Sequence, residues 1–97
     1  MKALILATSV LLSAPAVAED DFCTQIHTLG ETIMGARQKG MSLPTMMGTL
    51  QGNLKELLTP IVMEAYSHPL YSTPEIKKKT VSEFANSLQL KCMRETN

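Results

Sequence analysis

The sequence predicts an all-α fold, a small bundle of three to five helices with the first and last helices antiparallel and joined by one disulfide. Apolar residues recur at steps of three and four beyond residue 19, which is the spacing of a buried helix face. No segment shows the strict alternation of a half-buried strand. The two cysteines, Cys23 and Cys92, fall near the start of the first helical segment and near the end of the last. Antiparallel packing of those two helices would bring them together.

Residues 1–18 have the three parts of a secretory signal peptide. Lys2 supplies a positive charge, residues 3–12 form a short apolar run, and the pattern Ala16-x-Ala18 fits the site of signal peptidase. The run is too short for a membrane-spanning helix, which needs roughly 20 apolar residues. We therefore expect cleavage after Ala18 and a secreted, periplasmic protein. Lipidation is not expected, because no cysteine directly follows the apolar run.

The remaining residues, 19–97, are expected to form a single small domain. A core of that size supplies only a few kcal/mol of net stability, so a covalent link contributes much. Export would place Cys23 and Cys92 in an oxidising compartment that favours a disulfide. In the chain-entropy account, closing a loop of about 70 residues stabilises the fold by roughly 4 kcal/mol. Free thiols, or a bond between two chains, are the alternatives.

Capping residues and glycines predict where the first two helices begin and end. The first helix should run over 20–38, with Asp20 or Asp21 as its cap and Gly40 as its stop. Ser42 should then open a short second helix with a proline in its first turn.

The third and last helices carry capping-box patterns. Asn53, with Glu three residues later, predicts the start of the third helix. Pro60 lies inside this helix, so it either kinks one helix or begins a new one capped by Thr59. The last helix should begin at Ser72, by the same capping-box pattern, and run to about Arg94.

The charge balance gives no basic surplus. The chain carries nine Lys or Arg and nine Asp or Glu, so its formal net charge is zero. We expect no nucleic-acid partner and no stable membrane insertion after cleavage. The one basic run, 77–79, is interpreted as a solvated helix face.

Residues that could carry chemistry are sparse. Glu31 lies four residues after His27, and His27 lies four after Cys23, but a zinc site needs three or four ligands, and this cysteine is expected to be oxidised. His68 follows a serine, yet nothing nearby suggests an oxyanion site or a third catalytic group. We therefore expect no enzyme activity, no metal and no cofactor.

Two segments are candidates for partner binding. The first is an aromatic corner between the third and last helices, and the second is a methionine cluster beside the short helix. The alternative is that these side chains pack the corner and the core; a further alternative at the methionines is a copper(I) thioether site. The partner-binding residues predicted from these segments are Tyr66, His68, Pro69, Tyr71, Met41, Met46 and Met47.

A set of matching positions extends over most of the chain beyond residue 19: 22–23 through 36–37, 65–66, Pro69, 71–72, Phe84 and Cys92. In these positions the sequence resembles a group of small, mostly uncharacterised two-cysteine helical secreted proteins of Gram-negative bacteria and their prophages. The resemblance implies a helical fold and a secreted location. It implies no activity and no catalytic residue.

These observations favour a small periplasmic, non-catalytic protein-binding module, such as an inhibitor, immunity or exclusion-type factor. Its partner would be another protein, and a homodimer is left open. The alternative is an acid- or stress-activated chaperone, because carboxylates lose their charge at low pH and self-repulsion could then open a marginal domain.

Overall fold

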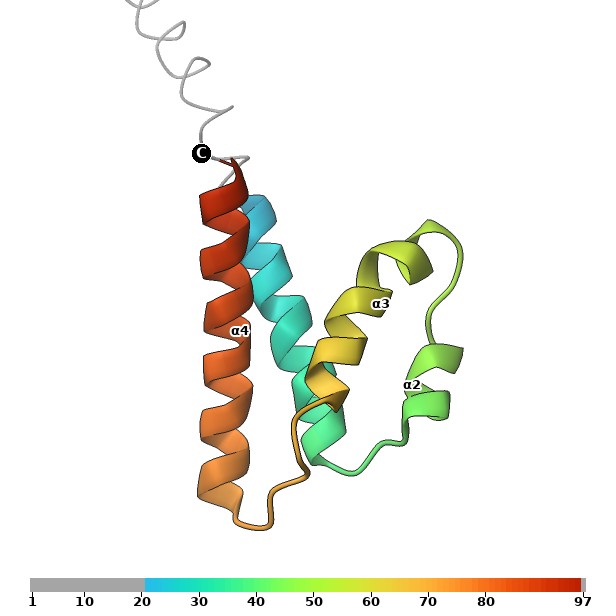
Figure 1. Ribbon diagram of the computed structural model, residues 1–97, viewed down its shortest axis with the longest axis vertical. Helices are drawn as coiled ribbons and strands as arrows, with labels where there is room; N and C mark the ends of the chain where they lie inside the picture. The colour runs from blue at the N-terminus through green and yellow to red at the C-terminus, as the bar shows by residue number, and fades with distance from the viewer. Residues whose placement is uncertain (1–20, 97) are drawn as a thin grey trace, which may run out of the picture.

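The structure is a computed structural model that describes residues 21–96, and this part of the chain is helical with no strand. The first helix is described over 21–38 and is followed by α2 (Leu43–Gly48), α3 (Asn53–Tyr66) and α4 (Pro74–Thr96). Figure 1 shows the first helix and α4 side by side, with α2 and α3 forming an arm that leans away from them. The predicted all-α bundle is confirmed. The predicted signal peptide, 1–18, lies outside the described residues.

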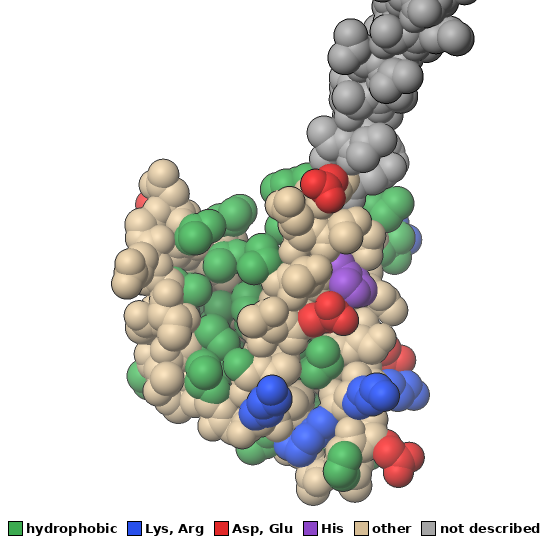
Figure 2. All heavy atoms as spheres, turned by 180° about the vertical axis from the view of Figure 1, so that it is seen from behind, with side chains coloured by type: hydrophobic (Ala, Val, Ile, Leu, Met, Phe, Trp, Pro, Cys, Tyr) green, Lys and Arg blue, Asp and Glu red, His purple; other side chains and the backbone are tan. Residues whose placement is uncertain are grey.

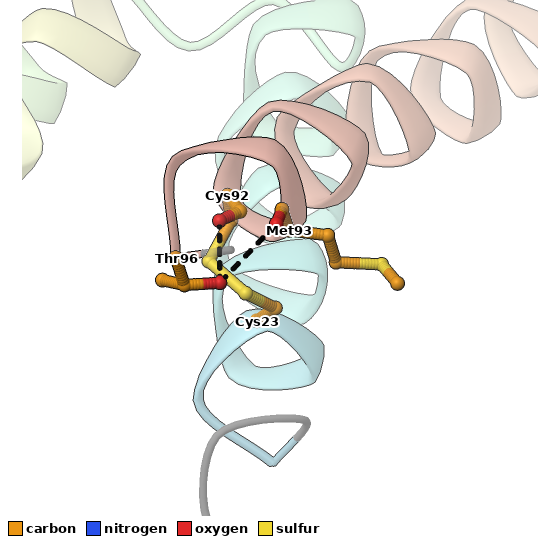
Figure 3. Close-up of a disulfide and its surroundings, with 4 residues drawn as sticks. All are labelled: Cys23, Cys92, Met93 and Thr96. Carbon is orange, nitrogen blue, oxygen red and sulfur yellow. Dashed lines mark hydrogen bonds between the residues drawn. A yellow bond between two sulfur atoms is a disulfide. The ribbon is translucent and has the colours of Figure 1, made fainter.

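The first helix and α4 are antiparallel and covalently joined. Cys23 and Cys92 form a disulfide with a Cα–Cα distance of 5.6 Å, which confirms the predicted pairing (Figure 3). Next to it, the Thr96 hydroxyl donates to the carbonyl oxygens of Cys92 and Met93 in the last turn of α4. The disulfide therefore fixes the start of one long helix against the end of the other.

A glycine lets the same two helices approach closely farther along. A Cβ atom on Gly30 would lie 2.6 Å from Leu88 Cδ1 and 3.3 Å from the Cα atom of Ala85. The Leu88 methyl group can rotate away, but the Ala85 backbone is closer than ordinary van der Waals contact, so a side chain at this position would push the two helices slightly apart. Gly35 lies farther along the same helix, and a Cβ atom on it would have no atom within 4 Å.

The core lies where the end of α3 meets the helix pair. Every helix supplies at least one buried apolar side chain, as the spacing of apolar residues predicts. The buried residues of this cluster are Ile33, Met34, Met46, Val62, Ala65, Phe84 and Leu88.

Of the caps predicted for α2, α3 and α4, one is confirmed and two are wrong. The Ser42 hydroxyl accepts from the backbone N–H of Thr45, which confirms the predicted cap of α2. The predicted Asn53 cap is wrong, because the N-cap of α3 is Gly52, at φ 61°, a conformation that glycine tolerates. The predicted Ser72 cap is also wrong: α4 begins at Pro74, and Thr73 accepts from the N–H of Ile76.

Pro60 does not divide the third helix. α3 runs unbroken from Asn53 to Tyr66 with this proline inside it. The proline ring has no N–H to donate to the carbonyl four residues earlier. One residue before it, the Thr59 hydroxyl donates to the Lys55 carbonyl.

None of the helices in 21–96 is both long enough and apolar enough to cross a membrane.

Candidate functional site

The predicted aromatic corner is tied to the end of the first helix. The Tyr66 hydroxyl donates to the carbonyl oxygen of Met41 at 2.8 Å. The Arg37 guanidinium lies over the Tyr66 ring, 5.2 Å from its centroid, and donates two hydrogen bonds to the His68 carbonyl at 3.0 and 3.2 Å. Burial raises the pKa of the Tyr66 phenol above its usual 10.0, and the Arg37 charge acts in the opposite direction.

A buried glutamine fixes the rest of the corner. Gln38 is only 3% exposed; its Nε2 donates to the Pro69 carbonyl at 2.9 Å, and its Oε1 accepts from the Tyr71 N–H at 3.0 Å. Lys77 donates to the backbone carbonyl of Gln38 at 2.6 Å, at the C-terminal end of the first helix. The His68 ring meets Phe84 edge to face, with centroids 5.8 Å apart. The polar atoms of this corner are thus largely committed to the fold.

The methionine segment also contributes to packing. Met46 is buried in the core cluster, and Met41 and Met47 are half-buried against it. The Tyr66, His68 and Met46 side chains are therefore in internal contacts, and little of Met46 is available to a partner, whereas Pro69 is exposed and Tyr71 half-buried, with only their backbone atoms bonded to Gln38. Their role in binding stays a prediction.

Exposed apolar side chains gather elsewhere, in a groove that the sequence analysis did not single out. The groove has a volume of about 250 Å³ and opens between the arm and the disulfide-linked end of the helix pair. Figure 2 shows hydrophobic side chains lining the hollow beside the arm. We call this the apolar groove; its lining residues are Phe22, Ile26, Leu57, Ile61, Leu88, Lys91, Cys92, Glu95 and Thr96.

Two walls of the apolar groove carry large side chains that remain in solvent. Phe22 of the first helix is 48% exposed, and Leu57 of α3 is 51% exposed. Leu54, one turn before Leu57, is exposed as well. The sequence offers one signal for this groove: the apolar face of α3 is wider than the part that is buried, Leu58, Val62 and Ala65.

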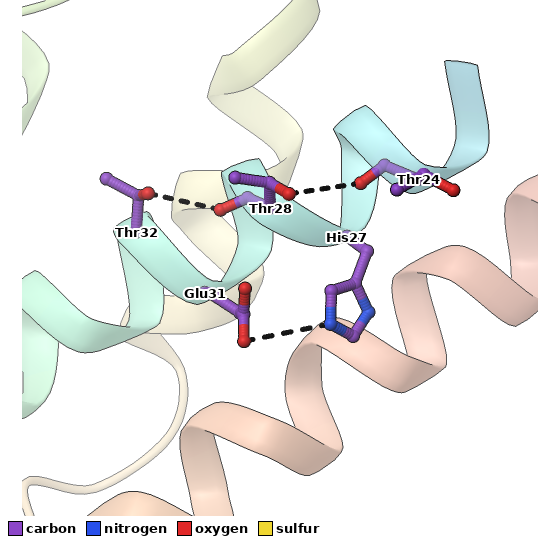
Figure 4. A network of polar contacts seen from close by, with 5 residues as sticks. All are labelled: Thr24, His27, Thr28, Glu31 and Thr32. Carbon is purple, nitrogen blue, oxygen red and sulfur yellow. Dashed lines mark hydrogen bonds and ion pairs between the residues drawn. The ribbon is translucent and has the colours of Figure 1, made fainter. Parts of the chain in front are cut away.

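Polar contacts on the first helix form no assembled metal or catalytic site. His27 Nε2 lies 3.7 Å from a carboxylate oxygen of Glu31, on the side toward α4 (Figure 4). The Thr28 and Thr32 hydroxyls donate to the carbonyls of Thr24 and Thr28, one turn earlier. Within 21–96, no three His, Cys, Asp or Glu side chains come together in a metal-binding group.

Comparison with protein-family models, with curated proteins and with solved structures found no match.

Proposed function

We propose that this protein is an exported, non-catalytic protein-binding module that takes an apolar helical segment of another protein into the apolar groove. The observation that carries the proposal is the exposure of Phe22 and Leu57 on facing walls of that groove. Large apolar side chains that remain in solvent around a groove are typical of an interaction surface.

The lining suits an amphipathic helix better than a small polar ligand. Its inner surface is formed by Ile26, Ile61 and Leu88, whereas Lys91 and Glu95 lie at its α4 side. An amphipathic helix would place apolar side chains inside and polar ones along such a rim. Side chains from successive turns of that helix would fill the volume of about 250 Å³.

The disulfide supports a binding role at this position. Cys92 is itself one of the lining residues, and its bond to Cys23 holds two helices of the groove in a fixed relation. A wall that is already ordered lowers the entropic cost of association. The disulfide also fits an oxidising compartment, and together with the predicted signal peptide it favours the periplasm.

The test compares two exposed positions on α3. Leu57→Asp puts a charge into the apolar groove, while Met63→Asp puts the same charge on a side chain that is 63% exposed and does not line it. The oxidised protein, carrying a photo-crosslinking residue at Ile61, would be exposed to periplasmic extract, with circular dichroism to check the fold. We expect one defined adduct, weakened at least about tenfold by Leu57→Asp because buried apolar anchors carry most binding energy.

The possible outcomes distinguish a specific binding module, a stress chaperone and a homodimer. A single adduct that survives Met63→Asp and is lost with Leu57→Asp supports a specific module. Adducts with many unrelated chains, formed only at acid pH, would favour the stress-chaperone alternative. An adduct of doubled mass would identify a second copy of this chain as the occupant. Equal crosslinking by both aspartate variants would refute the groove as the binding site.

A further inference from the structure

The net charge of the chain is zero, but its basic and acidic residues are unevenly distributed over the structure. The end of the first helix and the first turns of α4 meet at one end of the molecule (Figure 1). Five basic residues fall there, Arg37, Lys39 and 77–79, against a single acidic residue, Glu75. Figure 2 shows most of the visible Lys and Arg side chains gathered at this end. One further acidic residue, Glu31, lines a groove of the first helix together with Lys39, and the next acidic residue on α4 is Glu83.

Not all five of these charges are free. Arg37 and Lys77 donate to backbone carbonyls of His68 and Gln38. The other three, Lys39, Lys78 and Lys79, are exposed, and in residues 21–96 the one ion pair within 4.0 Å joins His27 and Glu31.

Two of the three free lysines converge from separate segments: Lys39 lies directly after the first helix, and Lys78 lies in α4. Lys39 and Lys78 line one shallow groove together with Lys77, between the end of the first helix and the start of α4. Gly35, Pro74 and Val81 supply the apolar part of its lining. The groove has a volume of about 280 Å³.

Two large apolar side chains are exposed at the same end. Leu70, in the connection between α3 and α4, is 49% exposed, and Ile76, in the first turn of α4, is 46% exposed. The connection forms the tip of the molecule opposite the disulfide (Figure 1). We call this surface the basic end; it consists of Lys39, Lys77, Lys78, Lys79, Leu70 and Ile76.

We propose that the basic end docks reversibly on an anionic phospholipid bilayer. Lys39, Lys78 and Lys79 would contact lipid phosphates, while Leu70 and Ile76 would enter the boundary between headgroups and acyl chains. Charge complementarity selects the lipid: lysines without an ion pair and exposed Leu and Ile side chains at one end of a molecule are the usual composition of a surface that lies in a membrane interface.

The geometry favours a bilayer over an acidic protein. Leu70 belongs to the connection that forms the tip of the molecule and Ile76 to the first turn of α4, and neither of them lines either groove; exposed apolar side chains at a tip can enter a broad, deformable surface. Docking through this end would also leave the apolar groove free, because that groove lies at the disulfide-linked end. The protein would thereby hold its partner at the membrane surface.

The test is co-sedimentation of the processed, oxidised protein with vesicles of phosphatidylcholine alone or with an equimolar amount of phosphatidylglycerol. We expect binding to the anionic vesicles that weakens as salt is added. The triple variant Lys39→Gln, Lys78→Gln, Lys79→Gln should lower the partition coefficient at least about tenfold, since each lysine near an anionic surface contributes several-fold. Leu70→Ser should lower it further.

The matched control removes the same number of charges elsewhere. Lys55, Lys91 and Arg94 lie outside the basic end, so their replacement by Gln should leave most of the binding intact. Equal losses in both triple variants would overturn the proposal in favour of net charge alone. Absence of binding to anionic vesicles, or binding to heparin without binding to vesicles, would overturn it as well. None of these results depends on the apolar groove, so the protein-binding proposal fails or stands separately.

Discussion

The guanidinium of Arg37 donates two hydrogen bonds to the backbone carbonyl of His68, which lies 31 residues later in the chain. The next residue, Gln38, donates to the Pro69 carbonyl and accepts from the Tyr71 N–H. Two adjacent side chains at the end of the first helix therefore position the whole connection between α3 and α4. This connection carries Leu70, so the shape of the basic end depends on these contacts.

Gln38→Ala should destabilise the fold by roughly 2 to 4 kcal/mol, because it removes two hydrogen bonds and leaves a carbonyl and an N–H without partners in a partly buried place. Chemical denaturation measures the loss. Gln25→Ala, at an exposed position of the same helix, is the control and should change stability by less than about 0.5 kcal/mol. Equal effects of the two substitutions would show that the Gln38 contacts contribute nothing beyond helix propensity.

The two central glycines of the first helix should respond in opposite directions to alanine. At Gly30, the new Cβ would meet Leu88 and the backbone of Ala85, so we expect a loss of about 1 to 3 kcal/mol from overpacking. At Gly35 nothing lies within 4 Å, and alanine should stabilise the helix by about 1 kcal/mol. Thermal unfolding of both variants measures these changes. A stabilised Gly30→Ala would mean that the helix pair can separate at little cost.

Some features of this fold are predictable from its sequence, and others are not. The antiparallel pair was predictable because periodicity locates both helices, and the cysteines Cys23 and Cys92 mark which ends meet. The Ser42 cap was predictable because it depends on residues three positions apart. The role of Gln38 was not, since its partners lie more than 30 residues away and no local pattern announces them.

The candidate surfaces were harder to predict for a related reason. The spacing of apolar residues shows that Leu57 shares a face with the buried residues of α3. It does not show at which residue this face stops being covered by the helix pair. α3 leans away from the helix pair toward its start, so Leu54 and Leu57 stay in solvent (Figure 1). Similarly, a balanced total charge cannot reveal that Lys39 and Lys78 line the same groove.

Removal of the disulfide should cost about 4 kcal/mol, the loop-closure value for cysteines separated by 69 residues. The Cys23→Ser, Cys92→Ser double variant should unfold at much lower denaturant, because a small domain has only about 5 to 15 kcal/mol in total. The unmodified protein under reducing conditions should match it. A double variant as stable as the oxidised protein would mean that packing of α4 against the first helix suffices.

Stability should fall at alkaline pH through Tyr66. Its folded-state pKa is raised above 10.0 by burial, so the fold favours the protonated phenol. This contribution is fully present below the unfolded pKa and is lost as the pH rises through the higher folded value. Ionisation would also remove the proton that the hydroxyl donates to Met41. In a Tyr71→Phe variant Tyr66 is the only tyrosine, so its absorbance titration gives the folded pKa directly.

The matching stability measurement compares Tyr71→Phe with the double variant Tyr66→Phe, Tyr71→Phe from about pH 8 to about pH 11. At the lower end of this range the double variant should be less stable by about 1 kcal/mol, the net value of one hydrogen bond. This difference should shrink as the pH rises, because only the protein that retains Tyr66 has the phenol to ionise. A Tyr66 titration midpoint at or below 10.0, or a difference that does not change with pH, would contradict the assignment.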